Sequence, residues 1–405
     1  MRIALVSDIH YGQLSTTSEL AVNGEKLTIG ELKNAKPLFL GLMEILRLQK
    51  PDYLFIAGDL TSTGSPLEFK YCHKKICELA DFVGISLNNI VVCLGNHDID
   101  WRISKIASSY DLAPDALDDI TYLKDNYRKL AHSWSIQTDG FGNSVFTNFK
   151  DAYCTPLTGV IEYDSCIVFV LNSAHLCTND QKCMHGCLHS SQFEWLRQAA
   201  GNYQQDTRAK IVLLHHHPFN YPYPLNGLDI STLEEGSELL QFCGQTGIDL
   251  VLHGHRHHPK AKTVFETGWK KPVTFICSGS LSVNASHRLE GTIPNTFHII
   301  DYNNSDHIIL SNYYYNLSSG WSLIEKDEHR TPVDGKMRLG KIVEDSAATA
   351  LIKQLPINQK IEYDTLCDDL LYLPLNKLNL LTKQVFKDDF HIFGVFPEDI
   401  IIFKS

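Results

Sequence analysis

Short apolar runs alternate with segments of helical periodicity in the first hundred residues of the chain. The stretches RIALVSD, PDYLFIAGDL and NIVVCLGNHD each predict a buried strand that ends in polar or small residues. Between them, KPLFLGLMEILRLQK places Leu38, Leu42, Ile45 and Leu46 at helical spacing, and EFKYCHKKICELADFVG predicts a helix that ends at Gly84. Strands that alternate with helices in this way predict an α/β fold.

The second half of the chain is richer in predicted strands. CIVFVLNSA, AKIVLLHHH, GIDLVLHGH and VTFICSGS predict further buried strands, and TFHIIDYNN and HIILSNYYYN predict an antiparallel pair. The polar stretch SSGWSLIEKDEHRTPVDG reads as a linker. We therefore expect a main domain over residues 1–317, a linker over 318–335, and a small C-terminal α/β or α+β appendage over 336–405 without a chemical motif.

Polar side chains follow five of these apolar runs at the point where each predicted strand ends. In an open α/β sheet, ligands bind beyond the carboxyl ends of the strands. His10 stands two residues beyond Asp8, the first of these positions, and His255 stands two residues beyond His253, the last. An extended chain places residues two apart on the same side. The candidate metal ligands are Asp8, His10, Asp59, Asn96, His215, His253 and His255.

This mixture of carboxylate, amide and imidazole ligands suits borderline to hard divalent metals such as Mn, Fe, Zn or Mg, among which we favour Mn. Seven ligands are too many for one ion, but they fit two ions that share one carboxylate, as in two-metal hydrolytic sites. Gly58, Gly95 and Gly254 adjoin the proposed ligands, and glycine permits sharp turns and close backbone approach.

The motifs DIH, GDL, GNHD, a histidine after a strand, and GHRH, in this order, resemble the calcineurin-like metallophosphoesterase superfamily. The resemblance implies a four-layered αββα sandwich of two facing sheets. It also implies an allocation of the ligands in which Asp59 bridges the two metals. One metal would be held by Asp8, His10 and His255, and the other by Asn96, His215 and His253.

Within the superfamily, LNSAH…HGCLHSSQFEWL followed by VLLHHHPF is similar to the class III cyclic-nucleotide phosphodiesterases. In such relatives the first histidine of a triple run is the ligand. The resemblance therefore favours His215 over His216 as the ligand.

Two cations lower the pKa of a bridging water, and the resulting hydroxide attacks phosphorus in line with the departing oxygen. His97, beside the ligand Asn96, is predicted to assist the leaving group or to contact a phosphate oxygen, and the resemblance implies the same role. Asp98 is predicted to orient the His97 imidazole. We expect hydrolysis of a small phosphodiester, nucleotide-like or cyclic-nucleotide in character.

Two other functions stay open at this point, beside protein phosphatase activity, which is less favoured. One is a metal-dependent nuclease acting on DNA or RNA, with the C-terminal segment as a cap over the substrate. The other is a non-catalytic scaffold that has lost its metals. The mark of a scaffold is a missing ligand, and the sequence lacks none of the seven.

The composition of the chain limits the classes of ligand and the cellular compartment that we expect. The chain has 405 residues, which favours two domains, and a formal net charge of −11, which disfavours a long nucleic acid as ligand. No apolar stretch is long enough to span a bilayer, and the N-terminus lacks a signal-peptide pattern. Together with eleven scattered cysteines, these features predict a cytoplasmic protein with free thiols. The oligomeric state is left open.

The stretch HLCTNDQKCMHGCLH allows a second metal hypothesis. Cysteines and histidines together can bind structural zinc tetrahedrally. The segment lacks a close Cys-x-x-Cys pair, so free thiols on a loop near the site are favoured over zinc. The residues concerned are Cys177, Cys183 and Cys187, with His175, His185 and His189.

Overall fold

The computed structural model describes most of the chain. The described residues are 1–21, 36–99, 158–174, 177, 185–188, 190–219, 231–287, 293–323, 335–356, 360–362, 366–373, 375–386, 390–395 and 399–404.

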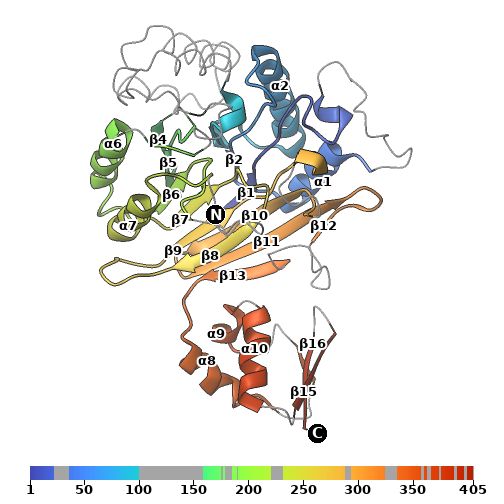
Figure 1. The fold of residues 1–405 in the computed structure, drawn as a ribbon, viewed down its shortest axis with the longest axis vertical. Coiled ribbons are helices and arrows are strands. Elements are labelled where there is room, and N and C mark those ends of the chain that lie inside the picture. Colours follow the sequence, from blue (N-terminus) through green and yellow to red (C-terminus); the bar gives the residue numbers. More distant parts are fainter. Residues whose placement is uncertain are drawn as a thin grey trace.

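The first sheet has the strand order β12-β11-β10-β1-β2-β3, and β13 pairs with β11 beside β12 (Figure 1). β1, β2 and β3 are parallel, and β10 to β13 form antiparallel pairs with their partners. The strands are β1 (Arg2–Val6), β2 (Tyr53–Ala57), β3 (Ile90–Cys93), β10 (Thr296–Asn304), β11 (His307–Asn316), β12 (Gly320–Leu323) and β13 (Lys336–Gly340).

The second sheet has the order β4-β5-β6-β7-β9-β8, with β5, β6, β7 and β9 parallel. Its strands are β4 (Gly159–Glu162), β5 (Cys166–Val170), β6 (Ala209–Leu213), β7 (Leu250–His253), β8 (Lys260–Val264) and β9 (Val273–Cys277). Four longer helices flank the two sheets: α1 (Leu38–Gln49), α2 (Pro66–Val83), α6 (Ser190–Gly201) and α7 (Gly236–Thr246).

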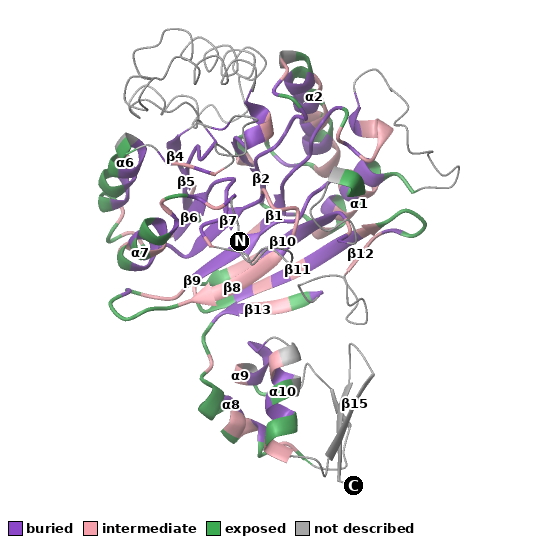
Figure 2. Ribbon diagram, in the orientation of Figure 1, coloured by how far each residue is buried: buried purple, intermediate pink, exposed green. Residues whose placement is uncertain are grey.

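The two sheets bury one core between them, and the helices cover their outer faces. Along β6, Ile211 and Leu213 belong to the core shared with the first sheet, whereas Val212 packs against the cluster that contains residues of α6 and α7. Figure 2 shows that α6 and α7 turn buried faces to the strands and exposed faces to solvent. This alternation has the period of two expected for strands covered on both sides. The predicted αββα sandwich is confirmed.

Local signals set the ends of the helices. α2 begins after Ser65, whose side chain accepts a hydrogen bond from the Glu68 amide, with Pro66 at the first position. It ends at Gly84, as predicted, with the left-handed φ of 83° that glycine adopts without strain. Among the described helices, none combines the length and hydrophobicity needed to cross a membrane.

The main domain extends further along the chain than its predicted end at residue 317. β12 lies within the predicted linker 318–335 and pairs with β11, and β13 opens the predicted C-terminal unit but also pairs with β11. The polar composition of this stretch concealed short strands that are stabilised by backbone pairing with a long neighbour. We therefore place the domain boundary after Gly340.

The C-terminal unit has its own hydrophobic cluster, which includes Ile352, Leu370 and Leu381. It consists of three helices and a three-stranded sheet below the main domain in Figure 1. The elements are α8 (Asp345–Ile352), β14 (Lys360–Glu362), α9 (Asp368–Leu371), α10 (Leu375–Phe386), β15 (Phe390–Val395) and β16 (Asp399–Lys404).

Candidate metal centre

Six side chains converge at the carboxyl ends of the central strands of both sheets. They form two groups, in each of which one potential ligand atom per residue lies within 4.8 Å of the others. Asp59 belongs to both groups. The first group is Asp8, His10, Asp59 and His257, and the second is Asp59, His215 and His255.

Asp59 stands between the two groups. Its Oδ2 lies 3.3 Å from Nε2 of His10 and 3.3 Å from Nε2 of His215. Its other oxygen, Oδ1, accepts a hydrogen bond of 2.8 Å from the amide of His97. The carboxylate is therefore held by the backbone on one side and offers the other oxygen to both groups, which is the geometry required of a bridging ligand.

The second group also includes the predicted ligand Asn96. The Nδ1 atom of His215 is 2.7 Å from the carbonyl oxygen of Ala57, so Nδ1 carries the proton and Nε2 presents a lone pair. Nε2 lies 3.1 Å from Oδ1 of Asn96 and 3.2 Å from Nδ1 of His255. Lone-pair atoms that face one another at this distance repel unless a cation or a proton lies between them.

The first group is almost wholly buried. Oδ1 of Asp8 lies 3.1 Å from Nε2 of His257 and 3.8 Å from Nε2 of His10. Within the described part of the chain, this Asp8 oxygen and both ring nitrogens of His10 are buried without a hydrogen-bond partner. Buried polar atoms are normally paired, so their orphaned state points to a ligand at this position.

The backbone is strained at most of these positions. Six non-glycine residues in the described ranges have a positive φ, and five of them are in the two groups: Asp8, His10, Asp59, His255 and His257. Such conformations cost of order 1–3 kcal/mol each and cluster at functional sites. The chain turns sharply after each strand, and this turn directs the side chain back over the sheet.

The glycines beside the ligands allow close approach, as predicted. A Cβ atom on Gly95 would lie 2.1 Å from Oδ1 of Asp59, and one on Gly254 would lie 1.8 Å from Oγ of Ser7. Gly58 has a φ of 86°, and a Cβ atom there would lie 2.5 Å from Nδ1 of His215. Any side chain at these three positions would displace the site.

The last histidine pair differs from the prediction by two residues. His253 was expected to bind the metal opposite His255, but its ring lies in neither group, whereas His257 lies in the first. His255 joins the second group and not the first. The stretch GHRH occupies residues 254–257. Its two histidines, His255 and His257, directly follow the glycine with the same His-x-His spacing, and this pattern was the signal in the sequence that identifies His257.

Strand alternation explains the position of His253. β7 continues through His253, and its residues Leu250 and Leu252 face the core between the sheets. Val251 packs on the opposite side, among the residues that contact α6 and α7. His253 therefore follows Val251 to the outer side of the sheet. Only after the turn at Gly254 does the chain return its side chains to the metal centre.

The same alternation distinguishes the triple histidines. His215 follows Leu213 toward the space between the sheets and joins the second group. His216 points elsewhere: its Nδ1 lies 2.9 Å from Oγ of Ser173 and its Nε2 lies 3.7 Å from Sγ of Cys177. The structure thus brings His215, rather than His216, to the metal centre.

His97 and Asp98 do not form the predicted pair. The Nδ1 atom of His97 donates to the carbonyl oxygen of Ser62 at 3.0 Å. Asp98 instead accepts hydrogen bonds from the amides of Leu60, Thr61 and Gly95. Asp98 thereby joins the loops after β2 and β3, and the His97 ring, which makes an edge contact with His10 at 4.6 Å, is oriented by a carbonyl group.

In the metal-free protein, protons take the place of cations. Burial opposes the protonation of His10, but the adjacent carboxylates of Asp59 and Asp8 outweigh burial and raise its pKa to about 9. Burial also opposes the protonation of His215, and the charge of Asp59 raises its pKa to about 9. Burial and the nearby charge of Asp59 raise the pKa of Asp98 to about 7.

The described part of the cysteine loop does not form the Cys/His cluster of the zinc hypothesis, although Cys187 lies near the two carboxylates of Glu234 and Glu235. The Cys177 thiol lies against His216, whereas the Cys187 thiol donates to Glu235 at 3.4 Å. Burial and the charge of Glu235 raise the pKa of Cys187, which opposes the thiolate that zinc binds. The other residues of that hypothesis, His175, Cys183 and His189, lie outside the described residues.

The donor set fits two divalent cations. Each group combines carboxylate oxygen with imidazole nitrogen, and Asn96 adds an amide oxygen to the second, which suits Mn, Fe, Zn or Mg. The strained turns and the tautomer of His215 orient the ligand atoms. Such a pair of cations is suited to hydrolysis of phosphoesters.

Comparison with known proteins agrees with this chemistry. The family model of calcineurin-like phosphoesterases matches residues 1–259. A search of curated proteins finds no significant match.

Among solved structures, the chain is similar to a purple acid phosphatase from yellow lupin (Lupinus luteus) seeds, with 12% identity, a TM-score of 0.49 and coverage of 84% of this chain and 53% of that chain. It thus spans about half the length of the lupin protein. It is also similar to a dimetal phosphatase from Danio rerio, with 11% identity, a TM-score of 0.44 and coverage of 77% and 95%.

Proposed function

Because this chain belongs to the calcineurin-like phosphoesterase family, we propose that it hydrolyses a small phosphodiester, such as a cyclic nucleotide or a related nucleotide-like compound. The observation that carries the proposal is the position of Asp59 Oδ2, 3.3 Å from a histidine of each group. When bound there, two divalent cations supply Lewis acidity, which acidifies water and neutralises charge on the phosphoryl oxygens. We propose Mn as the preferred metal.

His97 is the residue best placed to act on the leaving group. Its Nδ1 donates to the carbonyl of Ser62, which fixes the orientation of the ring. The ring stands beside His10, at the edge of the first group. A protonated Nε2 can donate to the departing oxygen, and a neutral one can accept from a substrate hydroxyl group.

Two observations support a small substrate over a nucleic acid at this centre. The chain has a formal net charge of −11, so a long polyanion needs a local basic surface, and the two ligand groups of the metal centre contain no lysine or arginine. The C-terminal unit follows Gly340 at the end of β13. Gly340 pairs with His307 on β11, and His307 pairs with Asn304 at the end of β10. This end of β10 lies beside the amino end of β1. The metal ligands lie at the carboxyl end of β1, so the unit is poorly placed to cap a substrate there.

The residues that resemble class III phosphodiesterases contact His216, the second histidine of the triple run, and the end of β5. Gly186 lies against the His216 ring, where a Cβ atom would approach Cγ to 2.3 Å. Gln192 accepts from the amide of Asn172 and donates to its carbonyl group, which fixes the end of β5. Cytoplasmic location is part of the proposal, in keeping with the nine free thiols of the described residues.

The test is a substrate screen with purified, Mn-loaded protein. The panel contains a phosphomonoester, cyclic nucleotides, dinucleotides, single-stranded oligonucleotide and supercoiled plasmid, each assayed with the parent protein and with Asp59→Asn. We expect cyclic nucleotides or dinucleotides to be cleaved fastest and the variant to be inactive. Cleavage of the plasmid alone would replace the proposal with a nuclease. Failure of the Mn-loaded protein on every substrate would refute it.

A further inference from the structure

The C-terminal unit has the topology of a winged helix. Its elements follow the order α8, β14, α9, α10, β15 and β16, and its antiparallel sheet has the order β14-β16-β15. α9 ends at Leu371 and α10 begins at Leu375, so three residues separate them. Two helices joined by a three- or four-residue turn form a helix-turn-helix, in which the second helix is the recognition helix.

One face of α10 packs on the rest of the unit and the other faces solvent. Leu378 and Leu381 are buried in the cluster shared with Ile352 of α8 and Leu370 of α9. Leu380 is 55% exposed, and Lys383 and Gln384 are also exposed. The packing fixes the helix within its unit and leaves this exposed face available.

The sequence of α10 differs in charge from the unit around it. Residues 341–405 contain seven lysines and ten acidic residues, yet α10, LNKLNLLTKQVF, contains two lysines and no acidic residue. Its polar residues are lysine, asparagine, glutamine and threonine. Among the side chains of α10 that the structure describes, glutamine is a type that reads adenine in the major groove, and lysine binds guanine or phosphate.

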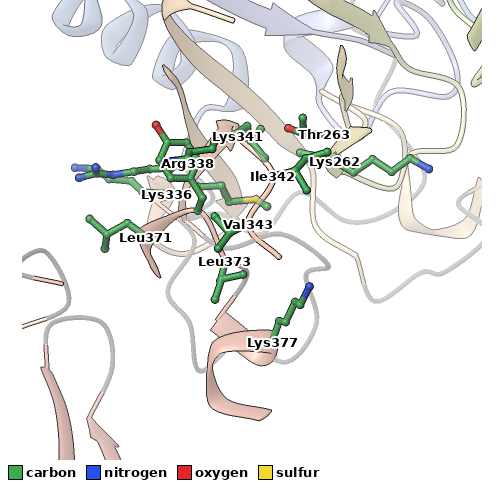
Figure 3. A pocket seen from close by; sticks show the side chains of 14 residues that line it. Lys262, Thr263, Lys336, Arg338, Lys341, Ile342, Val343, Leu371, Leu373 and Lys377 are labelled. Atoms are coloured by element: carbon green, nitrogen blue, oxygen red, sulfur yellow. The ribbon is translucent and has the colours of Figure 1, made fainter. Parts of the chain in front are cut away.

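A basic groove lies beside the start of α10. It has a volume of about 230 Å³ and lies between the unit and strands β8 and β13, with an apolar floor that includes Val343 and Leu373 (Figure 3). Its 14 lining residues include no carboxylate. They include five cationic residues, although the whole chain is acidic: Lys262, Lys336, Arg338, Lys341 and Lys377.

The cations of the groove differ in their present contacts. Lys341 forms an ion pair with Asp369, and Lys377 forms one with Asp345 at 2.6 Å. The Lys262 amine lies over the Phe219 ring, 3.0 Å from its centroid. Lys336 and Arg338 lie on β13, at the edge of the main domain that faces the unit. In Figure 3 the side chains of Arg338 and Lys262 extend to opposite sides of the groove, so charge from both domains lies at its rims.

We infer that the C-terminal winged helix binds duplex DNA, with α10 in the major groove and the basic groove against the adjacent phosphates. This function goes beyond the proposed hydrolysis. DNA bound there lies at the amino end of β1, away from the metal ligands, so it tethers the enzyme and is not its substrate. Because few cations take part, binding is weak, and its salt slope is shallow in proportion to the small number of phosphate contacts.

The experiment measures fluorescence anisotropy of a labelled duplex of about 30 base pairs with the full chain in EDTA. Chelation makes the result independent of hydrolysis, so failure here and failure of the proposed function are distinguishable. We expect micromolar affinity at low salt, in the range of non-specific DNA binding. Raising the salt concentration should weaken binding along a log–log line.

Three variants locate the surface. Lys383→Glu on α10 and the pair Lys336→Glu with Arg338→Glu on β13 should each weaken binding about tenfold or more. Lys383→Glu should also lower the salt slope by about one. Lys74→Glu is the matched control, because Lys74 is 71% exposed on α2, at the far end of the molecule in Figure 1, and should bind like the parent. Circular dichroism checks that every variant is folded.

Two results would overturn the inference. The first is that the folded parent protein does not bind the duplex at low salt, or that the control Lys74→Glu weakens binding as much as the α10 and β13 variants do. The second is self-association in sedimentation velocity that Leu380→Glu abolishes while DNA does not bind, which would assign the exposed face to a second copy of this chain.

Discussion

The Nε2 atom of His215, after a strand of one sheet, lies 3.3 Å from Oδ2 of Asp59, after a strand of the other. The contact joins the two sheets at the point where both present their carboxyl ends. Nδ1 of the same histidine donates to the carbonyl of Ala57 in β2, so one ring connects a strand of each sheet. The metal centre therefore depends on the packing of the two sheets against each other.

Asp59→Asn tests the bridge. The amide removes the charge shared by the two groups while keeping the shape of the side chain. We expect kcat/KM to fall by roughly 10³-fold, equivalent to about 4 kcal/mol. Metal analysis should show fewer than two ions per chain. Asp81→Asn, at an exposed position on α2, is the matched control. A bridge variant as active as that control would contradict the assignment.

The positions of His253 and His257 are tested by metal stoichiometry. His257→Ala removes a ligand atom 3.1 Å from Asp8, and we expect it to lose one of two bound ions. His253→Ala should retain both, because its ring lies on the outer side of the sheet, although the cavity it leaves should lower the melting temperature. Loss of an ion from His253→Ala and not from His257→Ala would restore the prediction from sequence.

His97→Ala tests the assignment of the leaving-group residue. General acid–base catalysis contributes typically 10²–10⁴-fold, so kcat should fall by about that factor. Because the His97 ring is not in either ligand group, metal content should be unchanged. A substrate with a leaving group of low pKa, such as a nitrophenyl ester, should be affected less than a nucleotide. Equal loss on both substrates would argue against proton donation.

Gly95→Ala tests the close approach to Asp59. The added Cβ would lie 2.1 Å from Oδ1 of Asp59, so the carboxylate must move. We expect a loss of both metal binding and activity, together with a lower melting temperature. Gly201→Ala is the control, because nothing lies within 4 Å of a Cβ there and helical alanine is favoured by roughly 0.5–1 kcal/mol. Normal metal content in Gly95→Ala would show that the loop adapts.

The stability of the metal-free protein should fall at alkaline pH. His10 and His215 have a pKa raised from 6.5 to about 9 by the nearby carboxylates. Their contribution to stability is therefore fully present below pH 6.5 and is lost as the pH rises through 9. Melting temperatures in EDTA should decline over this interval. With Mn the decline should be smaller, because metal ligation replaces the protons. A flat profile in EDTA would contradict the buried ion pairs.

The sequence alone determined the architecture of the main domain. Apolar runs of strand length, separated by helical periodicity, predict alternating strands and helices, and their polar ends at Asp8, Asp59 and His215 predict the edge where ligands gather. These features are local, because each depends on a few neighbouring residues. The same local signals identified Gly84 as a helix end and placed glycines beside the ligands.

Only the tertiary structure decided which atoms meet. His253 and His257 each stand two residues from His255, but strand β7 carries the first to the outer face and the turn at Gly254 returns the second. Asp98 was predicted to orient His97, yet it holds backbone amides of two loops, and the domain boundary moved because β12 and β13 pair with β11. Side-chain direction and strand pairing depend on contacts between distant segments, and a local pattern does not contain them.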